Sequence, residues 1–547
     1  MVITDFLEKN ARLYGSEIAL VEINPSEERD KATTWREASL IEVASNAPYR
    51  REITWRQFDK NANRFANLLL SRGIRRGTKV GILLMNCLEW LPIYFGILKA
   101  GCIAVPLNYR YSSGEIEYCL ELADVEVLIF GPEFTDRLSL IKPFLDEEVN
   151  YVFFVGCEKQ RPDFAEPYNM LVNFCSFEAP PISCTEDDHA AIYFSSGTTG
   201  FPKAILHNHR ALLSACLTEQ NHHHQTRRDV FLCIPPLYHT GAKMHWFGSL
   251  MSGSRAVLLR GVTPEWILRT VSEEKVTIVW LLVPWAQDIL DAIESGAVSL
   301  DNYMLDQWRL MHIGAQPVPH SLIMRWKQHF PHHEYDTNYG LSESIGPGCV
   351  HLGVENIDKV GAIGKAGYRW QTRIVDENGD ECAENQVGEL TVKGDGVMLC
   401  YYKNPKATAE VLKDGWLYTG DMAYKDEDGF IFLVDRKKDV IIMGGENIYP
   451  VQIEDFMHHN AKIKDVAVIG LPDDRLGEIA AAIIEIKDGM ECTEDEINEF
   501  CKHLPRYKRP RKIIFDKVPR NPTGKIEKPA LRQKYCADRL VESQTKK

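Results

Sequence analysis

A run of small hydroxyl and glycine residues that ends in a lysine is the segment of this chain best suited to chemistry. The apolar residues 190–194 predict a strand, and the loop after it offers hydroxyl and backbone N–H groups that can converge on one anion. The lysine adds a positive charge that suits phosphate oxygens. No Gly-Lys-Ser/Thr step closes the segment, so it differs from the Walker pattern. The residues expected to hold phosphate are Ser195, Ser196, Gly197, Thr198, Thr199, Gly200 and Lys203.

Further motifs follow this loop along the chain. They are Tyr-Gly-Leu-Ser-Glu at 339–343, Tyr-Thr-Gly-Asp at 418–421, Asp-Arg-Lys-Lys-Asp at 435–439, Gly-Gly-Glu-Asn-Ile-Tyr-Pro at 444–450 and Pro-Thr-Gly-Lys at 522–525. Together with the loop, this series resembles the adenylate-forming superfamily of acyl-CoA synthetases, adenylation domains and luciferases. The resemblance extends from residue 53 to residue 525. Within the superfamily, the chain resembles the acyl-CoA synthetase branch.

The resemblance implies a site for ATP and Mg²⁺. Glu343 matches the family's magnesium-ligand glutamate, and a carboxylate suits a hard cation that bridges phosphate oxygens. Ser342 stands where threonine is commoner and keeps a hydroxyl for the phosphates. Tyr339 is expected to stack on adenine, and Asp421 to accept hydrogen bonds from the ribose hydroxyls. Asn338 and Gly340, which flank the tyrosine, complete the expected nucleotide site.

Two half-reactions are implied by the same resemblance. Lys525 matches the family's adenylation lysine, which bridges the substrate carboxylate and the α-phosphate and should act most strongly at the transition state. The small domain then swings about a hinge at Lys438, and coenzyme A attacks the acyl-adenylate. Arg436 is expected to contact ribose or phosphate. The expected tunnel residues for coenzyme A are Gly444 and Gly445, with Arg260 and the basic stretch 506–509 as further phosphate contacts.

The segment 235–246 matches the wall of the acyl pocket in this family. Amino-acid-activating relatives carry an aspartate where this chain has His239, and the absence of that aspartate favours a plain carboxylic acid as substrate. His239 is also among the expected catalytic residues. Acetate-specific relatives carry tryptophan at the position of Gly340, so glycine predicts a deep pocket. A medium-chain, cyclic or aryl acid is the expected substrate. The expected pocket residues are His239, Gly241, His245, Trp246, Gly314, Ala315, Gln316, Gly340 and Gly346.

Helical patterns alternate with short apolar runs through most of the chain and predict the elements that position these residues. Residues 58–70 and 90–98 read as helices, and 79–84 and 102–106 as strands, which is typical of layered parallel α/β structure. The polar stretch 24–51 is expected to form a surface excursion. Strands are also predicted at 466–470, 480–486 and 512–515. We therefore expect an α/β N-terminal domain at 1–434, with a β-rich subdomain, and a small mobile α+β domain at 435–547.

Composition excludes several other classes of protein. The 547 residues include 63 basic and 77 acidic ones, and the net charge of −14 argues against nucleic-acid binding. The 14 cysteines show no C-x-x-C pair or zinc spacing and read as buried apolar residues in a reducing cytoplasm. His222, His223 and His224 are consecutive and cannot all face one ion, so a solvated polar loop is expected. No signal peptide or membrane span is expected, and the oligomeric state stays open, with a homodimer as one option.

Two functions remain open at this point. The first is an AMP-forming carboxylic acid:CoA ligase that uses ATP, Mg²⁺ and coenzyme A, and that can run towards ATP when pyrophosphate is plentiful. The second is a stand-alone adenylation enzyme that loads a carrier protein. Dependence of turnover on coenzyme A separates these two. A luciferase-like reaction is disfavoured, and a non-catalytic protein would be expected to lack Lys525 or Glu343, which this chain keeps.

Overall fold

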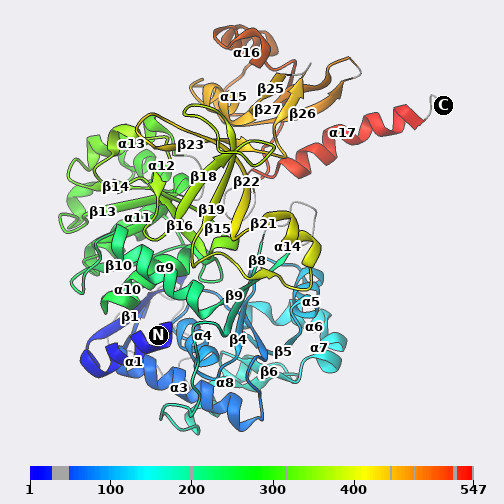
Figure 1. Cartoon of the computed structure of the whole chain (residues 1–547). Coiled ribbons are helices and arrows are strands. Elements are labelled where there is room, and N and C mark those ends of the chain that lie inside the picture. The colour runs from blue at the N-terminus through cyan, green and yellow to red at the C-terminus, as the bar shows by residue number, and fades with distance from the viewer. Residues whose placement is uncertain are drawn as a thin grey trace.

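Two large sheets with helices between and outside them form most of the molecule (Figure 1). The computed structural model describes residues 1–26, 48–195, 202–314, 318–443, 446–473, 475–520 and 526–544. Within these residues, the expected layered α/β architecture with a β-rich part and a smaller C-terminal α+β part is confirmed.

The first large sheet has seven strands, all parallel except β2. In spatial order they are β14 (Glu334–Asp336), β13 (Leu310–Gly314), β12 (Ile278–Leu282), β10 (Val230–Cys233), β11 (Arg255–Leu259), β1 (Ile18–Ile23) and β2 (Arg50–Thr54). Alternate residues face opposite layers. Leu258 and Leu310 join the core between the two sheets, whereas Leu259 and Met311 pack against the outer helices.

The second large sheet has eight strands and carries the proposed phosphate loop. In order they are β20 (Cys400–Tyr401), β9 (Ala204–Asn208), β8 (His189–Phe194), β4 (Ile103–Pro106), β3 (Lys79–Leu83), β5 (Val125–Phe130), β6 (Tyr151–Phe154) and β7 (Glu166–Pro167). The strands from β8 to β7 run parallel, and β9 and β20 are antiparallel to their neighbours. The loop therefore joins two antiparallel strands and is held at both ends.

Helices occupy the space between the sheets and cover their outer faces. The core between the sheets contains residues of α1 (Ile3–Leu13), α3 (Trp55–Ser71), α4 (Trp90–Lys99), α8 (Tyr168–Asn173), α9 (His209–His222) and α10 (Thr240–Ser252). The outer helices are α11 (Pro264–Glu273), α12 (Val283–Glu294) and α13 (His320–His329) on the first sheet, and α5 (Ser113–Leu122), α6 (Thr135–Leu140) and α7 (Lys142–Glu148) on the second. The start of α3 is set by a capping box, in which the Gln57 backbone N–H donates to the Thr54 hydroxyl at 3.2 Å.

Smaller antiparallel sheets join the large layers to the C-terminal part. One contains β15 (Asn338–Leu341), β16 (Gly346–His351) and β17 (Lys365–Ala366). The next contains β18 (Gln371–Val375), β19 (Gly388–Lys393), β22 (Trp416–Lys425), β21 (Leu412–Lys413) and β23 (Ile431–Arg436), with α14 (Pro405–Val411) beside it. Strand β23 spans the expected domain boundary at 434/435 and pairs with β22.

The residues after 440 form their own sheet, with α15 (Pro450–Met457), α16 (Glu494–Phe500) and α17 (Lys528–Gln544) around it, at the orange-to-red end of Figure 1. Its strands are β25 (Glu446–Ile448), β24 (Ile441–Met443), β27 (Gly477–Ile486), β26 (Ile463–Asp473) and β28 (Lys512–Phe515). The three strands that the sequence predicts in this part lie within β26, β27 and β28. No helix among the described residues is long and apolar enough to cross a membrane.

Three expectations need correction. The stretch 24–51 lies largely outside the described residues, but its end is not a surface excursion. Arg51 lies in β2, is 1% exposed and pairs with Glu22 at 2.5 Å and with Glu89 at 3.4 Å. The cysteines are all free, yet only eight are buried and six are half-buried. The third correction concerns the three histidines and follows with the site.

Candidate active site

The proposed phosphate loop is anchored where β8 and β9 meet. The Ser195 backbone N–H donates to the Lys203 carbonyl at 3.1 Å, and the Lys203 N–H donates to the Ser195 hydroxyl at 3.4 Å. The antiparallel pairing continues at once, with Phe194 opposite Ala204. The remaining loop residues, Ser196, Gly197, Thr198, Thr199 and Gly200, lie outside the described residues. The two described ends, Ser195 and Lys203, therefore lie next to each other where β8 ends and β9 begins.

Glu343 and Lys203 are brought together by a third residue, Tyr401. Its hydroxyl donates to Glu343 Oε1 at 2.8 Å, and Lys203 Nζ lies 4.6 Å from the centre of its ring. Burial and the neighbouring carboxylate raise the pKa of Tyr401 well above its ordinary value, so the hydroxyl stays protonated and donates. The Tyr401 ring lies close to Lys203 because β20 pairs with β9, which begins directly after Lys203. Sequence reasoning missed Tyr401, and no local spacing pattern marks it.

A histidine joins the same two parts of the site. His207 lies in β9, is fully buried, and its Nε2 lies 2.8 Å from the carbonyl oxygen of Ser342. Burial lowers the pKa of His207 to about 4, so the neutral ring donates to that carbonyl at physiological pH. This contact fixes the backbone of Ser342 next to Glu343.

The expected ribose-binding aspartate is buried in a cluster of polar groups. Asp421 is 5% exposed, accepts a hydrogen bond from the Tyr339 hydroxyl, and pairs with Arg436 Nε at 2.5 Å. The pairing of β22 with β23 sets Asp421 directly opposite Arg436. Tyr339 is itself 8% exposed and packs into the core of the β-rich part. Three residues from separate motifs therefore meet, as the sequence predicts for one nucleotide site.

Asn338 provides a test of whether these residues fit a nucleotide. Its side chain is 8% exposed, and its Nδ2 has no hydrogen-bond partner among the described residues. A Cβ added at Gly314 would be in ordinary van der Waals contact with Asn338 Oδ1, at 3.7 Å. A buried donor without a partner is costly unless a ligand satisfies it. With the carboxylate of Glu343 and the ammonium of Lys203, the residues present fit a polar anionic ligand with a bound cation.

The expected acyl-pocket residues separate into two groups. His239 is half-buried and directly precedes α10, and Gly346 packs on the start of that helix. A Cβ at Gly346 would lie 3.1 Å from the Thr240 carbonyl carbon and 3.2 Å from the Gly241 nitrogen, and its φ of 111° also requires glycine. Gly346 therefore allows a close approach of strand and helix. Ala315 and Gln316 lie outside the described residues.

Trp246 and His245, two more of the expected pocket residues, are fully buried. Trp246 is 0% exposed and packs against Phe58 and Phe95 in the core between the sheets, with ring centres 6.0 and 5.7 Å away. His245 is also fully buried, and its Nδ1 lies 2.8 Å from Glu219 Oε1. Both side chains lie in the core between the sheets, and their role in the acyl pocket stays a prediction.

A buried lysine next to them was also missed. Lys243 is 1% exposed, and its Nζ lies 4.1 Å from the ring centre of Tyr193 and 5.2 Å from that of Tyr94. Burial lowers the pKa of its amine well below the ordinary value. Since Tyr193 lies in β8, this contact ties α10, which follows His239, to the strand that leads into the phosphate loop.

The residues around the expected hinge connect the two parts of the chain. Asp435 is 7% exposed, accepts hydrogen bonds from the Arg436 and Val451 N–H groups, and burial raises its pKa to about 6. Asp439 pairs with Arg532 at 2.7 Å. Lys438 is exposed, and burial of part of its side chain lowers its pKa.

The remaining residues expected to act on coenzyme A or on the acyl group are only partly described. Lys525, Gly444 and Gly445 lie outside the described residues, although Arg520 and Ile526, which flank Lys525, form an antiparallel bridge. Arg260 pairs with Glu133, and Lys508 donates to Gln452 at 2.6 Å.

Of the three consecutive histidines only His224 is exposed in a turn, so the solvated loop expected for all of them is wrong for His222 and His223. His223 is 2% exposed, with Nδ1 2.6 Å from Glu219 Oε1 and Nε2 3.2 Å from Asp336 Oδ2. His222 stacks on His351 with ring centres 3.8 Å apart. The error arose because partners on β14 and β16, remote in sequence, cover the end of α9.

Comparison with known proteins agrees with this geometry. Residues 28–402 match the AMP-binding enzyme family, and residues 452–525 match the AMP-binding enzyme C-terminal domain. The long-chain-fatty-acid–CoA ligase FadD13 of Mycobacterium tuberculosis is 32% identical over 490 residues, which cover 89% of this chain and 93% of that protein. The feruloyl-CoA synthase of an Amycolatopsis species is 30% identical over 487 residues, which cover 88% and 94%.

Solved structures extend the likeness to the whole fold. A Mycobacterium tuberculosis fatty acyl CoA synthetase is 29% identical with a TM-score of 0.74, over 98% of this chain and 99% of that one. ATP-bound MatB from Rhodopseudomonas palustris is 25% identical with a TM-score of 0.83, over the same shares of the two chains. The chain therefore belongs to the AMP-binding enzyme family, as an ATP-using member of its acyl-CoA ligase branch.

Proposed function

We propose that this acyl-CoA ligase converts a medium-chain, cyclic or aryl carboxylic acid, with ATP and coenzyme A, into an acyl-CoA, AMP and pyrophosphate. The observation that carries the proposal is the meeting of Lys203 and Glu343 at Tyr401, beside the anchored loop. Relatives named for long-chain fatty acids and for ferulate, an aryl acid, support a substrate larger than acetate. His239, where an aspartate would hold an amino acid, supports a plain acid.

Adenylation requires a carboxylate to attack a phosphate although both are anions. Lys203 supplies a positive charge at the end of the loop, and its contact with the Tyr401 ring limits where the ammonium can lie. Glu343 would hold Mg²⁺, which supplies charge neutralisation at the phosphate oxygens. Tyr401 donates to the oxygen Oε1 and so leaves Oε2 of Glu343 for that ion. Asp421 and Arg436 would position the ribose, Tyr339 the adenine, and Ser342 the phosphates.

Lys525 would complete adenylation and then leave the site. We propose that residues 435–547 rotate about Lys438, so that Gly444 and Gly445 then line the path of coenzyme A. The hydrogen bond from the Val451 N–H to Asp435 crosses Lys438 and is a contact that this rotation would break, whereas Asp439 and Arg532 both follow Lys438 and would move together. The same site would form ATP from acyl-CoA, AMP and pyrophosphate when pyrophosphate is abundant.

Release of pyrophosphate from ATP and Mg²⁺, measured across a panel of acids with and without coenzyme A, tests the proposal. The panel contains acetate, hexanoate, octanoate, cyclohexane carboxylate, benzoate, cinnamate and several amino acids. We expect turnover that depends on coenzyme A and is greatest with a medium-chain, cyclic or aryl acid. A maximum with acetate or with an amino acid would refute the substrate class. Adenylate formation without any response to coenzyme A would refute the second half-reaction.

A further inference from the structure

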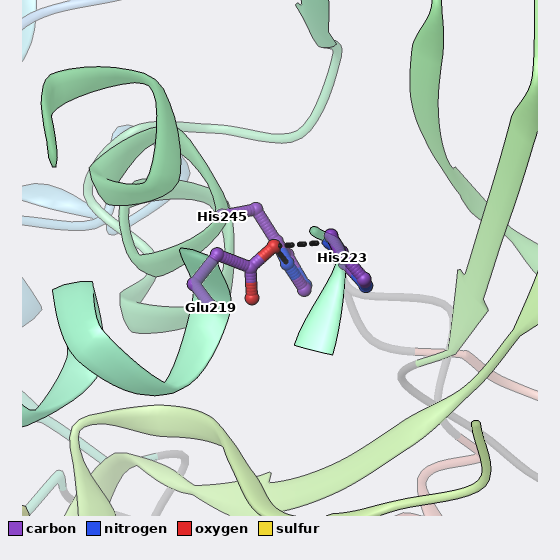
Figure 2. A group of neighbouring side chains, drawn as sticks. All are labelled: Glu219, His223 and His245. Atoms are coloured by element: carbon purple, nitrogen blue, oxygen red, sulfur yellow. Dashed lines mark hydrogen bonds and ion pairs between the residues drawn. The ribbon is translucent and has the colours of Figure 1, made fainter. Parts of the chain in front are cut away.

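A cluster of histidine and carboxylate side chains lies in the core between the sheets, apart from the residues that handle ATP. It consists of Glu219, His223, His245, His312 and Asp336, each 2% exposed or less. They come from α9 and the residue after it, from α10, and from strands β13 and β14. Figure 2 shows the carboxylate of Glu219 directed towards the rings of His223 and His245. Burial of so many polar groups calls for a physical reason.

Three atoms of this cluster converge at the separations that a metal ion imposes on its ligands. His223 Nε2 lies 2.9 Å from His312 Nδ1 and 3.2 Å from Asp336 Oδ2, and the last two atoms lie 3.6 Å apart. Ligand atoms about 2.0–2.1 Å from a tetrahedral Zn²⁺ are about 3.3 Å from one another. The three distances among His223 Nε2, His312 Nδ1 and Asp336 Oδ2 form a triangle whose sides are shorter or longer than this value by a few tenths of an ångström, so one ion can reach all three atoms.

Glu219 has a different geometry and a different role. Its Oε1 lies 2.6 Å from His223 Nδ1 and 2.8 Å from His245 Nδ1. The contact with His245 is a hydrogen bond and that with His223 is an ion pair, and both distances lie further below about 3.3 Å than any side of the His223–His312–Asp336 triangle. A proton on His223 Nδ1, the ring nitrogen nearer Glu219, leaves the Nε2 lone pair free to bind a metal. A carboxylate behind a ligating histidine is the usual arrangement at zinc sites.

Charge and hydrogen bonding point to the same conclusion. Glu219 and Asp336 place two carboxylates in the interior, and a divalent cation bound by neutral imidazoles would offset both negative charges. Without an ion, His223 Nε2 faces both His312 Nδ1 and Asp336 Oδ2 and can share only one proton with them. His245 Nε2, His312 Nε2 and Glu219 Oε2 are buried without a hydrogen-bond partner among the described residues.

We propose that His223 Nε2, His312 Nδ1 and Asp336 Oδ2 bind a divalent transition-metal ion of the Zn²⁺ class, with Glu219 orienting His223. Imidazole ligands select such ions over Mg²⁺, so this site is separate in chemistry from the one expected at Glu343. The ion would join α9 to β13 and β14. Because Asp336 lies just before Asn338, and His312 just before Gly314, it would hold the strand ends that position the nucleotide site.

Metal content and Co²⁺ spectroscopy of the full chain, purified without a histidine tag, test this site. We expect about one equivalent of Zn²⁺ per chain, removable by a strong chelator. Added Co²⁺ should then give the visible absorption of a low-coordinate cobalt site, which Zn²⁺ abolishes. A stripped parent protein that binds neither ion at about millimolar concentration would overturn the proposal without recourse to any variant.

Four variants locate the ion. Asp336→Asn should lose the cobalt spectrum, and Glu219→Gln should weaken binding about 10- to 100-fold because it alters only the group behind a ligand. His209→Gln, a buried histidine on the same helix but outside the cluster, and Glu343→Gln should both bind as the parent does. Circular dichroism establishes that each variant is folded. Equal affinity in a folded Asp336→Asn and the parent would refute the ligand assignment.

Discussion

Replacement of Tyr401 by phenylalanine removes a single hydrogen bond from the candidate site. The phenol is 6% exposed and donates to Glu343 Oε1 at 2.8 Å, whereas the ring that faces Lys203 is kept in the variant. A hydrogen bond to a charged group contributes about 1.5–3 kcal/mol. Since about 1.4 kcal/mol corresponds to a tenfold change in rate, kcat/KM for Mg²⁺-ATP should fall about 10- to 100-fold. The fall occurs because Glu343 is then free to turn away from the phosphates.

Pyrophosphate release at limiting Mg²⁺-ATP measures this effect. Tyr401→Leu also removes the ring under Lys203, and loss of that contact should cost about 0.5–2 kcal/mol more. Tyr402→Phe is the matched control, because its hydroxyl bonds to the exposed Asp124 at 2.8 Å and should not affect turnover. The prediction is refuted if kcat/KM of Tyr401→Phe stays within about twofold of the parent value, or if the variant reaches full activity at a lower Mg²⁺ concentration. In either case the hydroxyl would not be positioning the Glu343 carboxylate.

Three other predictions concern the lysines, the hinge and the core. Lys525→Ala should abolish adenylation but spare thioester formation from supplied acyl-adenylate, and Lys438→Pro should do the reverse; equal losses in both steps, measured separately, would contradict the alternation. Burial raises the pKa of Asp435 to about 6, so the folded state favours its neutral form. The free energy of unfolding should be highest below the unfolded pKa of Asp435 and should fall by up to about 3 kcal/mol as the pH rises through about 6. Thermal unfolding at several pH values measures this trend, and Asp435→Asn should lose it. Arg51→Ala removes the guanidinium that pairs with the buried carboxylates of Glu22 and Glu89 and should destabilise the protein by about 3–5 kcal/mol. Arg325→Ala at an exposed ion pair should cost about 0–1 kcal/mol, and similar unfolding temperatures for the two variants would refute the comparison.

The hydrophobic pattern predicted the regular elements that surround the site with small errors at their ends. The helix expected at 58–70 is α3 (Trp55–Ser71), and the strand expected at 79–84 is β3 (Lys79–Leu83). The first of these begins three residues early because Thr54 caps it. Such patterns predict helices and strands because the local spacing of apolar residues determines which side of the element faces the core.

The same reasoning failed where polar residues are buried by remote partners. Three histidines in a row look solvated, but His223 is covered by Asp336 and His312, which lie on strands far away in sequence. Only Glu219, one helical turn before His223, was a local signal that could have been read. Zinc spacing rules also miss ligands that come one at a time from separate elements.

By itself, the sequence determined the family, the order of the motifs and the chemistry that each could perform, because these depend on residue types and on short spacings. Only the tertiary structure decided that Tyr401 joins Lys203 to Glu343 and that a histidine–carboxylate cluster lies in the core. Both depend on pairings between distant segments, such as Tyr401 opposite Ile205 in the sheet. The free energy of those pairings comes from the packing of whole layers, and no local pattern records it.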